Sequence, residues 1–176
     1  MIMDRRTFLK NSALLGGAAL ITSQVYPHGL RGALNFTPPD IYRTGAGDIY
    51  QEIPRLFDAL GGAGTFVKQG DTVGMLVNSP WKHPGYYTSP DIPLAVAQLC
   101  LDSGASRVIC FKPVPDGYWE KSPHFNERSG LISKIAYSDE RVEVAIEGGL
   151  EMKTAEIFRD FLDVDVFINI PVAKHH

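Results

Sequence analysis

The chain has 176 residues, of which 44% are hydrophobic and 21% charged, the composition of an ordinary globular protein that can bury one core. Its formal net charge is −3 at pH 7, and removing the first two dozen residues leaves 14 basic and 19 acidic residues. An acidic chain with dispersed lysines argues against nucleic-acid binding, which needs a concentrated basic face. No stretch is long and apolar enough for a standard membrane span.

Residues 1–26 have the pattern of an export signal, because a charged start precedes a short, weakly apolar run at 13–21. The start resembles the twin-arginine signal, which would consist here of Arg5, Arg6, Phe8, Leu9 and Lys10. The alternative, an amphipathic first helix, is disfavoured by the glycines in the apolar run. We expect export in the folded state by the twin-arginine machinery, to the periplasm or elsewhere outside the cytoplasmic membrane. No clear cleavage site follows, so membrane contact would come only through a signal that persists.

Residues 27–47 are rich in proline and glycine and show no period, which predicts a linker before an α/β domain at 48–176. Apolar residues then recur at helical spacing from Ile49 to Leu60, and two glycines end the run. Pro54 inside this helix marks either its start or a kink. Residues 72–77 form a short apolar run that predicts a buried strand.

The remaining segments alternate between predicted helices and strands. Ser89 is expected to cap a helix that ends at Gly104, and residues 107–111 predict a second strand. A helix over about 126–136, a strand at 142–146, a helix capped by Thr154 and a strand at 164–170 follow. Continuous apolar strands separated by helices predict an α/β fold, with a mainly parallel sheet and helices on both faces. Since a domain seldom stops after a central strand, we expect truncation at the C-terminus.

The two cysteines, Cys100 and Cys110, lack the paired spacing of a zinc site or an iron–sulfur cluster. Both lie in apolar patterns that favour buried free thiols, although a disulfide between them remains an alternative. The sequence also lacks a phosphate-binding glycine loop and a serine nucleophile motif. The cofactor therefore stays unknown, and the sequence does not decide whether the protein is an enzyme.

Ligands of an open parallel sheet bind outside the carboxyl ends of its strands. Lysines follow three of the four predicted strands, and asparagine and histidine follow two of them. The candidate ligand-binding residues at these ends are Asn78, Lys82, His83, Lys112, Asn169, Lys174 and His175. In this hypothesis lysines balance the charge of an anionic small molecule or cofactor, asparagines orient it, and a histidine carries a proton.

Each candidate also has a structural interpretation. The asparagines would bond backbone groups in tight turns, and the lysines would be solvated loop charges. The histidines lack a metal-binding spacing, so we expect no metal. A group of loop aromatics would either pack over the sheet or wall a pocket: Trp81, Tyr86, Tyr87, Tyr118 and Trp119.

Several of these segments resemble the family known as domain of unknown function 362. The resemblance rests on Gly-Asp-Thr-Val at 70–73, Val-Asn-Ser-Pro at 77–80, Thr-Ser-Pro-Asp at 88–91, Ser-Gly-Ala-Ser-Arg-Val at 103–108 and the closing residues 168–176. It implies that the chain is the N-terminal part of a larger domain. Some members add an iron–sulfur module, for which this chain has no cysteines. A lysine that the family places at the first strand end is Leu76 here, and Lys82 is the residue that would replace it.

Together these patterns predict an exported cell-envelope protein that binds an anionic small molecule or cofactor at its strand ends. The alternative is a non-enzymatic binding or assembly module associated with an envelope redox complex. Strands 72–77, 107–111 and 165–169 are expected to lie in one parallel sheet, since each pair is joined by a connection long enough for a crossover helix.

Overall fold

The computed structural model describes residues 43–45, 47–79, 83 and 85–173. The predicted export signal, most of the predicted linker, Trp81, and the candidates Lys82, Lys174 and His175 lie outside the described residues. The chain divides into two compact units, one made of residues 41–140 and 158–176 and the other of residues 1–40 and 141–157. Each unit is described by itself.

The larger unit begins with helix α3 (Ile49–Ala59), whose first turn is capped by the Asp48 carboxylate accepting from the Tyr50 N–H at 3.0 Å. Pro54 lies inside this helix and does not begin it. The helix ends where predicted, because Gly61 and Gly62 have φ angles of 97° and 88° that other residues rarely adopt. A 3-10 turn, Ala63–Thr65, leads toward the sheet.

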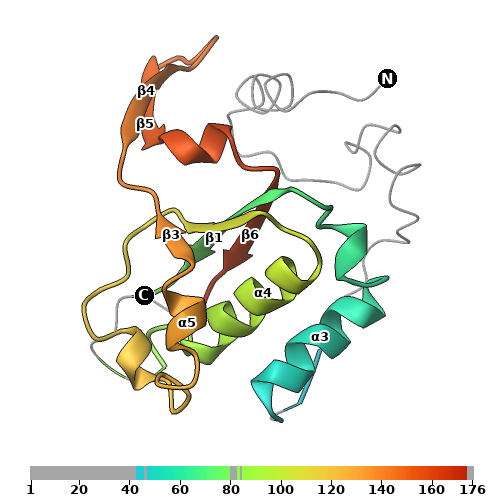
Figure 1. Ribbon diagram of the computed structural model, residues 1–176. Coiled ribbons are helices and arrows are strands. Elements are labelled where there is room, and N and C mark those ends of the chain that lie inside the picture. Colours follow the sequence, from blue (N-terminus) through green and yellow to red (C-terminus); the bar gives the residue numbers. More distant parts are fainter. Residues whose placement is uncertain (1–42, 46, 80–82, 84, 174–176) are drawn as a thin grey trace. The chain divides into compact units, whose positions relative to one another are not determined.

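The centre of this unit is a four-stranded parallel sheet (Figure 1). Its strands lie in the order β3 (Ile135–Tyr137), β2 (Arg107–Cys110), β1 (Thr72–Val77) and β6 (Val166–Ile170). Every neighbouring pair is parallel, and Gly74 lies opposite Ile109 on one side and Phe167 on the other. The α/β fold class and the parallel alignment of the three predicted strands are confirmed.

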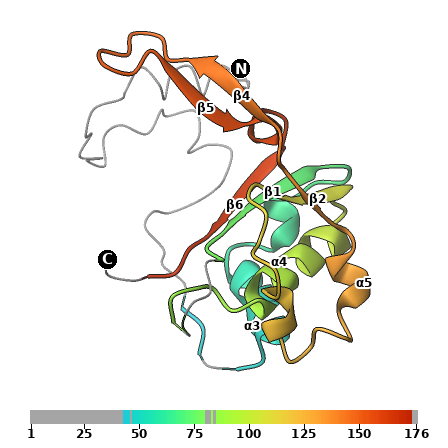
Figure 2. The ribbon, with the colours of Figure 1, turned by 90° about the vertical axis from the view of Figure 1, so that its left-hand side faces the viewer.

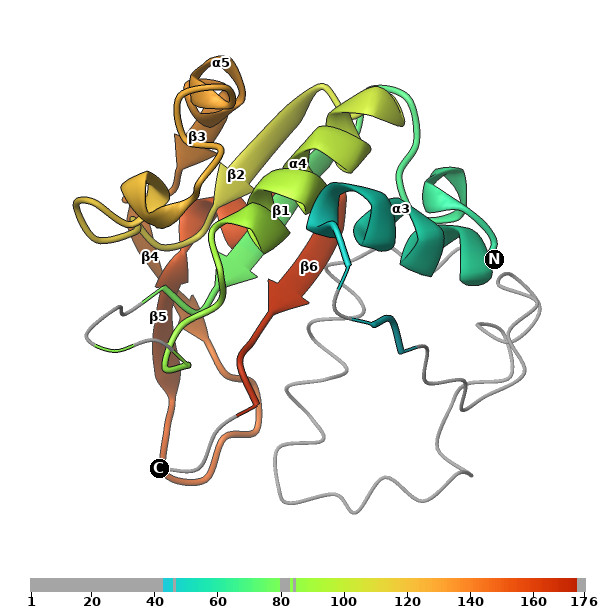
Figure 3. The same cartoon turned by 90° about the horizontal axis from the view of Figure 1, so that it is seen from below.

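Helical segments pack on both faces of this sheet. Alternate residues of β1, among them Val73, Met75 and Val77, join a core that includes side chains of α4 (Asp91–Asp102), and Tyr50 and Ile53 of α3 pack against it. Figure 3 shows both helices on this helix-covered face. On the opposite face a smaller cluster contains Ile109, Phe111 and Val164, with Phe161 of the 3-10 helix Arg159–Leu162 packed against it.

Several predicted elements are wrong. The predicted helix at 126–136 is only the single turn α5 (Ser129–Ile132), which is followed directly by strand β3. The predicted strand at 142–146 exists as β4 (Arg141–Ala145), but it belongs to a separate two-stranded sheet with β5 (Thr154–Phe158). Thr154 begins that strand and does not cap a helix; its hydroxyl donates to the Glu143 carboxylate across the pair at 2.6 Å.

The start of α4 also differs from the prediction. Pro90, and not Ser89, occupies the N-cap position, where no side chain accepts a hydrogen bond. The helix ends as predicted near Gly104, which has a φ angle of 105°. Cys100 and Cys110 are both free and buried, so the disulfide alternative is wrong.

The described part of the smaller unit is a hairpin of residues 141–157, called the arm below (Figure 2). Glu143 and Thr154 are joined across its strands, and so are Arg141 and Glu156, whose side chains form an ion pair at 3.0 Å. Neither strand contains a buried residue. Isolated two-stranded hairpins are at best marginally stable in water, so the arm needs contacts beyond its own strands.

Candidate functional site

The candidate site lies at the carboxyl edge of the parallel sheet. Because β2, β1 and β6 are adjacent and run in the same direction, the segments that follow them leave the sheet at one edge. Asn78 follows β1 directly, and Lys112 comes two residues after β2. This topology brings together the strand ends that the sequence predicted to form the site.

Asn78 closes the loop that joins β1 to α4. Its side-chain amide donates to the Tyr86 carbonyl at 3.0 Å, and its own carbonyl accepts from the Thr88 N–H at 2.9 Å. Its backbone N–H donates to the Ile170 carbonyl at 3.2 Å, which ties the loop to the end of β6. The side chain therefore holds the loop, as the structural interpretation of the asparagines proposed.

Thr88 is a buried link between three segments of this edge. Its hydroxyl donates to the Ile170 carbonyl at 3.1 Å, and its carbonyl accepts from the Tyr118 hydroxyl at 2.7 Å. Burial raises the pKa of Tyr118, so the phenol remains a hydrogen-bond donor throughout the ordinary pH range. These bonds fix the ends of β1 and β6 and the loop after β2 relative to one another.

The loop aromatics take different positions. Tyr118 and Trp119 are buried in the core, where the Trp119 indole donates to the Tyr137 hydroxyl at 2.7 Å. Tyr87 packs edge-on against Tyr118, with ring centroids 6.2 Å apart. Tyr86 is instead 58% exposed, with its ring edge-on to His83 at 5.5 Å. For Tyr118 and Trp119 the packing interpretation holds, whereas Tyr86 lies exposed in the loop after β1.

The other described candidates differ in location. Lys112 and His83 are exposed, and no ion pair of the Lys112 ammonium group is found within the described part of the chain. Asn169 lies within β6, opposite Leu76 of β1. Since Ile168 and Ile170 on either side of it pack in the helix-covered core, strand alternation puts Asn169 on the opposite face. Lys112 and His83 are thus at the edge, and Asn169 is on a face.

A polar cluster that the sequence reasoning did not identify lies at the start of α4. The Asp91 carboxylate accepts from the Tyr50 hydroxyl at 3.1 Å and from the Ser122 hydroxyl at 2.6 Å. The Arg128 guanidinium lies 4.1 Å from the centre of the Tyr50 ring. Burial, and then the Asp91 charge, raise the pKa of Tyr50 to about 12, so its hydroxyl stays a donor. The cluster joins α3, α4 and the segment after β2.

Two buried hydroxyl groups near the strand ends have no hydrogen-bond partner among the described residues. Ser79 follows Asn78 and is 1% exposed, and Ser138 follows β3 and is fully buried. A buried polar group without a hydrogen-bond partner costs about 1–3 kcal/mol. Such groups are therefore unusual in folded proteins. The signal that marks these residues in the sequence is their position one or two residues after a strand.

Other kinds of site were sought in the same residues. No group of three histidine, cysteine, aspartate or glutamate side chains that would hold a metal ion occurs in the described segments. No helix among the described residues is both long and apolar enough to cross a bilayer.

Comparison with known proteins identifies the family. Residues 74–176 match the model of a domain of unknown function, DUF362, and the chain belongs to that family. It is 30% identical over 145 residues to a thylakoid-associated protein of Synechocystis sp.. The match covers 74% of this chain but 42% of the relative, so the chain spans less than half of that protein's length. No solved structure matches the chain.

Proposed function

We propose that this DUF362 protein is exported to the cell envelope and binds an anionic small molecule or cofactor at the carboxyl edge of its parallel sheet. The observation that carries the binding proposal is the adjacency of β2, β1 and β6, whose ends are followed in sequence by Lys112, Lys82 and Lys174. Lysines at three neighbouring strand ends repel one another unless an anion or carboxylate lies among them.

Two features of the described residues support anion binding at this edge, a hydrogen-bonded backbone and an exposed lysine. The bonds of Asn78, Thr88 and Tyr118 fix the backbone, which reduces the entropy lost when a ligand is held. The exposed Lys112 has no carboxylate partner among the described residues, so its charge is available for an anion. The exposed His83 ring lies edge-on to Tyr86 in the same loop, with the ring centroids 5.5 Å apart.

Inorganic phosphate is a suitable probe of this edge. We expect phosphate to raise the unfolding temperature of the full chain, since a ligand at 100 times its Kd adds about 2.7 kcal/mol of stability. Replacing Lys112 by glutamine is expected to weaken phosphate binding about tenfold in calorimetric titration, which corresponds to about 1.4 kcal/mol.

Lys134→Gln is the matched control, because Lys134 is exposed and directly precedes β3. It therefore lies at the amino ends of the parallel strands, away from the carboxyl edge. The Lys134→Gln protein should bind phosphate like the unmodified chain. Equal losses for the two variants would indicate a diffuse surface charge effect and contradict a site at the carboxyl edge.

The export proposal rests on Arg5 and Arg6 ahead of the short apolar run. Replacing both by lysine keeps the charge but removes the guanidinium pair, so we expect the protein to remain in the cytoplasm. Cell fractionation and immunoblotting measure this. Export of the double variant by the same route would contradict the twin-arginine interpretation.

The second candidate function is a non-enzymatic binding or assembly module in the envelope. The name of the relative favours it, because association with the thylakoid is what that name states. Substrate-dependent turnover by the exported protein would favour an enzyme. Co-purification of the chain with a defined envelope complex would favour the assembly module, provided that the complex fails to form when the chain is absent.

A further inference from the structure

Among the described phenylalanine, tyrosine and tryptophan side chains, that of Tyr86 is the most exposed, at 58%. Its neighbour Tyr87 packs edge-on against the buried Tyr118, so the core accounts for one of these two loop tyrosines and not for the other. Binding sites for small molecules are lined mainly by aromatic and apolar side chains, with a few polar or charged groups that orient the ligand. Tyr86 is therefore a candidate for such a ligand contact at the carboxyl edge.

The Tyr86 ring projects from a turn whose backbone is held in place. The Tyr86 carbonyl accepts from the Asn78 side-chain amide at 3.0 Å, and the Tyr86 N–H donates to the His83 carbonyl at 3.1 Å. Gly85 has a φ angle of 85°, which other residues rarely adopt. Because these bonds order the turn before any ligand binds, a ligand that contacts the ring need not order the backbone.

The backbone also brings Lys112 to the strand end next to that of Asn78. The Phe111 N–H donates to the Met75 carbonyl at 3.0 Å, so β2 and β1 are still paired at this point. Lys112 follows directly, and Asn78 comes three residues after Met75. Paired strands lie about 4.8 Å apart. The lysine and the exposed ring of Tyr86, which Asn78 holds, therefore belong to neighbouring strand ends at one edge.

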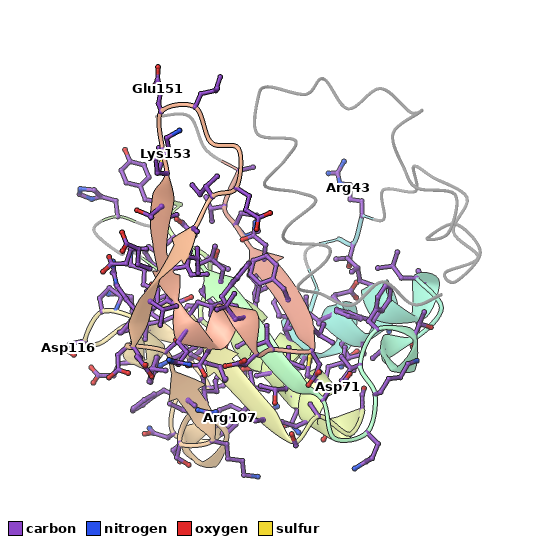
Figure 4. The ribbon with its side chains drawn as sticks, turned by 90° about the horizontal axis from the view of Figure 1, so that it is seen from above. Arg43, Asp71, Arg107, Asp116, Glu151 and Lys153 are labelled. Carbon is purple, nitrogen blue, oxygen red and sulfur yellow. The ribbon has the colours of Figure 1, made fainter. Side chains whose placement is uncertain are left out.

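No carboxylate near this edge forms an ion pair with Lys112 within the described residues. Asp91 accepts from two hydroxyl groups, and Glu140 forms an ion pair with an arginine at 2.6 Å. Asp139 comes two residues after β3, and β2 lies between β3 and β1. Figure 4 shows Asp116, in the loop after β2, at the outer margin of the larger unit. The neighbouring ends of β2 and β1 therefore carry a positive charge that is available to an anion.

We propose that the ligand of this edge is an anion that carries an aromatic ring. This inference rests on the proposed anion binding and specifies the class of anion. The Lys112 ammonium binds the anionic group, and the Tyr86 ring packs against the ring of the ligand, offset or edge to face as aromatic pairs prefer. The His83 ring, edge-on to Tyr86 at 5.5 Å, extends this aromatic surface. A lysine alone suits any anion, so Tyr86 supplies the selectivity for a ring.

The test compares two phosphate monoesters, methyl phosphate and phenyl phosphate, in calorimetric titrations of the full chain. We expect phenyl phosphate to bind about tenfold more tightly, because an aromatic pair contributes beyond the area that it buries. Tyr86→Ala should reduce the ratio of the two affinities to about one, whereas Tyr86→Phe, which keeps the ring, should preserve the ratio. Lys112→Gln should weaken the binding of both esters about tenfold, since both carry the anionic group.

Leu150→Ala is the matched control, because Leu150, in the arm, has the most exposed large hydrophobic side chain of the described residues, at 92%. The Leu150→Ala protein should retain the preference for phenyl phosphate. Equal affinities of the unmodified chain for the two esters would overturn the inference and leave the anion site standing. An equal loss of preference in the Leu150→Ala and Tyr86→Ala proteins would indicate a nonspecific apolar contact and overturn it too. If neither ester nor inorganic phosphate binds, the proposed anion binding is contradicted as well.

Discussion

The two faces of the parallel sheet are built differently from residues that alternate along the same strands. On the helix-covered face, Val73, Met75 and Val77 of β1 are nearly or fully inaccessible to solvent. On the other face the neighbouring positions are Gly74 and Leu76, and Leu76 is 39% exposed. Adjacent residues of one strand thus have very different environments, which the strand's continuous apolar sequence does not show.

The face that carries Leu76 and Phe167, called the open face below, nevertheless has an ordered centre. Phe111 has ring centroids 5.3 Å from Phe161 and 5.7 Å from Phe167, and those two rings are 5.3 Å apart. The Phe111 ring occupies the space above Gly74, where a Cβ atom would lie 2.1 Å from it. The comparison indicates that one face gains stability from the packed helices α3 and α4, whereas the other gains it from a small cluster around Phe111.

The largest expected effect comes from truncating neighbouring side chains on the two faces. Met75→Ala leaves a cavity in the helix-covered core and should lower the free energy of unfolding by about 3 kcal/mol. Leu76→Ala should lower it by less than about 1 kcal/mol, because the side chain is already partly in water. Urea unfolding at low protein concentration measures both. Equal losses would mean that the open face is covered within a single chain.

Gly74→Ala is expected to have the next largest effect. The added methyl group must displace the Phe111 ring and also lies 3.0 Å from Val164, so we expect a loss of about 2 kcal/mol. Phe111→Leu in the same protein should recover part of this loss, because the two sites are in contact.

Gly130→Ala is the control, because nothing lies within 4 Å of the added methyl group in the short helix α5. It should leave stability unchanged or raise it by up to about 1 kcal/mol. A Gly74→Ala protein as stable as the unmodified chain would show that the aromatic cluster does not depend on the close approach of the Phe111 ring to Gly74.

The sequence predicted the central sheet because its strands are continuous apolar runs, which is the pattern of strands buried on both sides. It misplaced the strand at 142–146, where Val142-Glu143-Val144 alternates between apolar and charged residues. That period of two indicates a half-exposed strand and fits the arm. Strand β3 has only three residues, too few to show any period.

The position of the candidate site was predictable, but most of its contacts were not. Parallel strands place their ends at one edge, so Asn78 and Lys112 are near that edge by topology alone. The Asp91 cluster joins residues separated by 41 and 31 positions, and no local pattern marks such pairs. Gly74 did carry a signal, since glycine within a strand indicates a close approach of another group.

The last prediction compares the two faces by thiol reactivity and uses a substitution that should leave stability nearly unchanged. Burial raises the pKa of Cys110, on the helix-covered face, to about 12, and that of Cys100 in α4 to about 11. A cysteine introduced by Leu76→Cys on the open face should keep an ordinary pKa near 8.5, so about a quarter of it is thiolate at pH 8, against roughly one part in ten thousand for Cys110.

Ellman's reagent should therefore label the Leu76→Cys protein once, rapidly, and label both native thiols only after unfolding in guanidinium. Because the native thiols deprotonate more readily in the unfolded chain, stability should also fall as pH rises from about 8.5 toward the folded pKa values. Rapid labelling of the unmodified protein would show that the helix-covered face opens readily. Slow labelling at position 76 would contradict the exposure of this position on the open face.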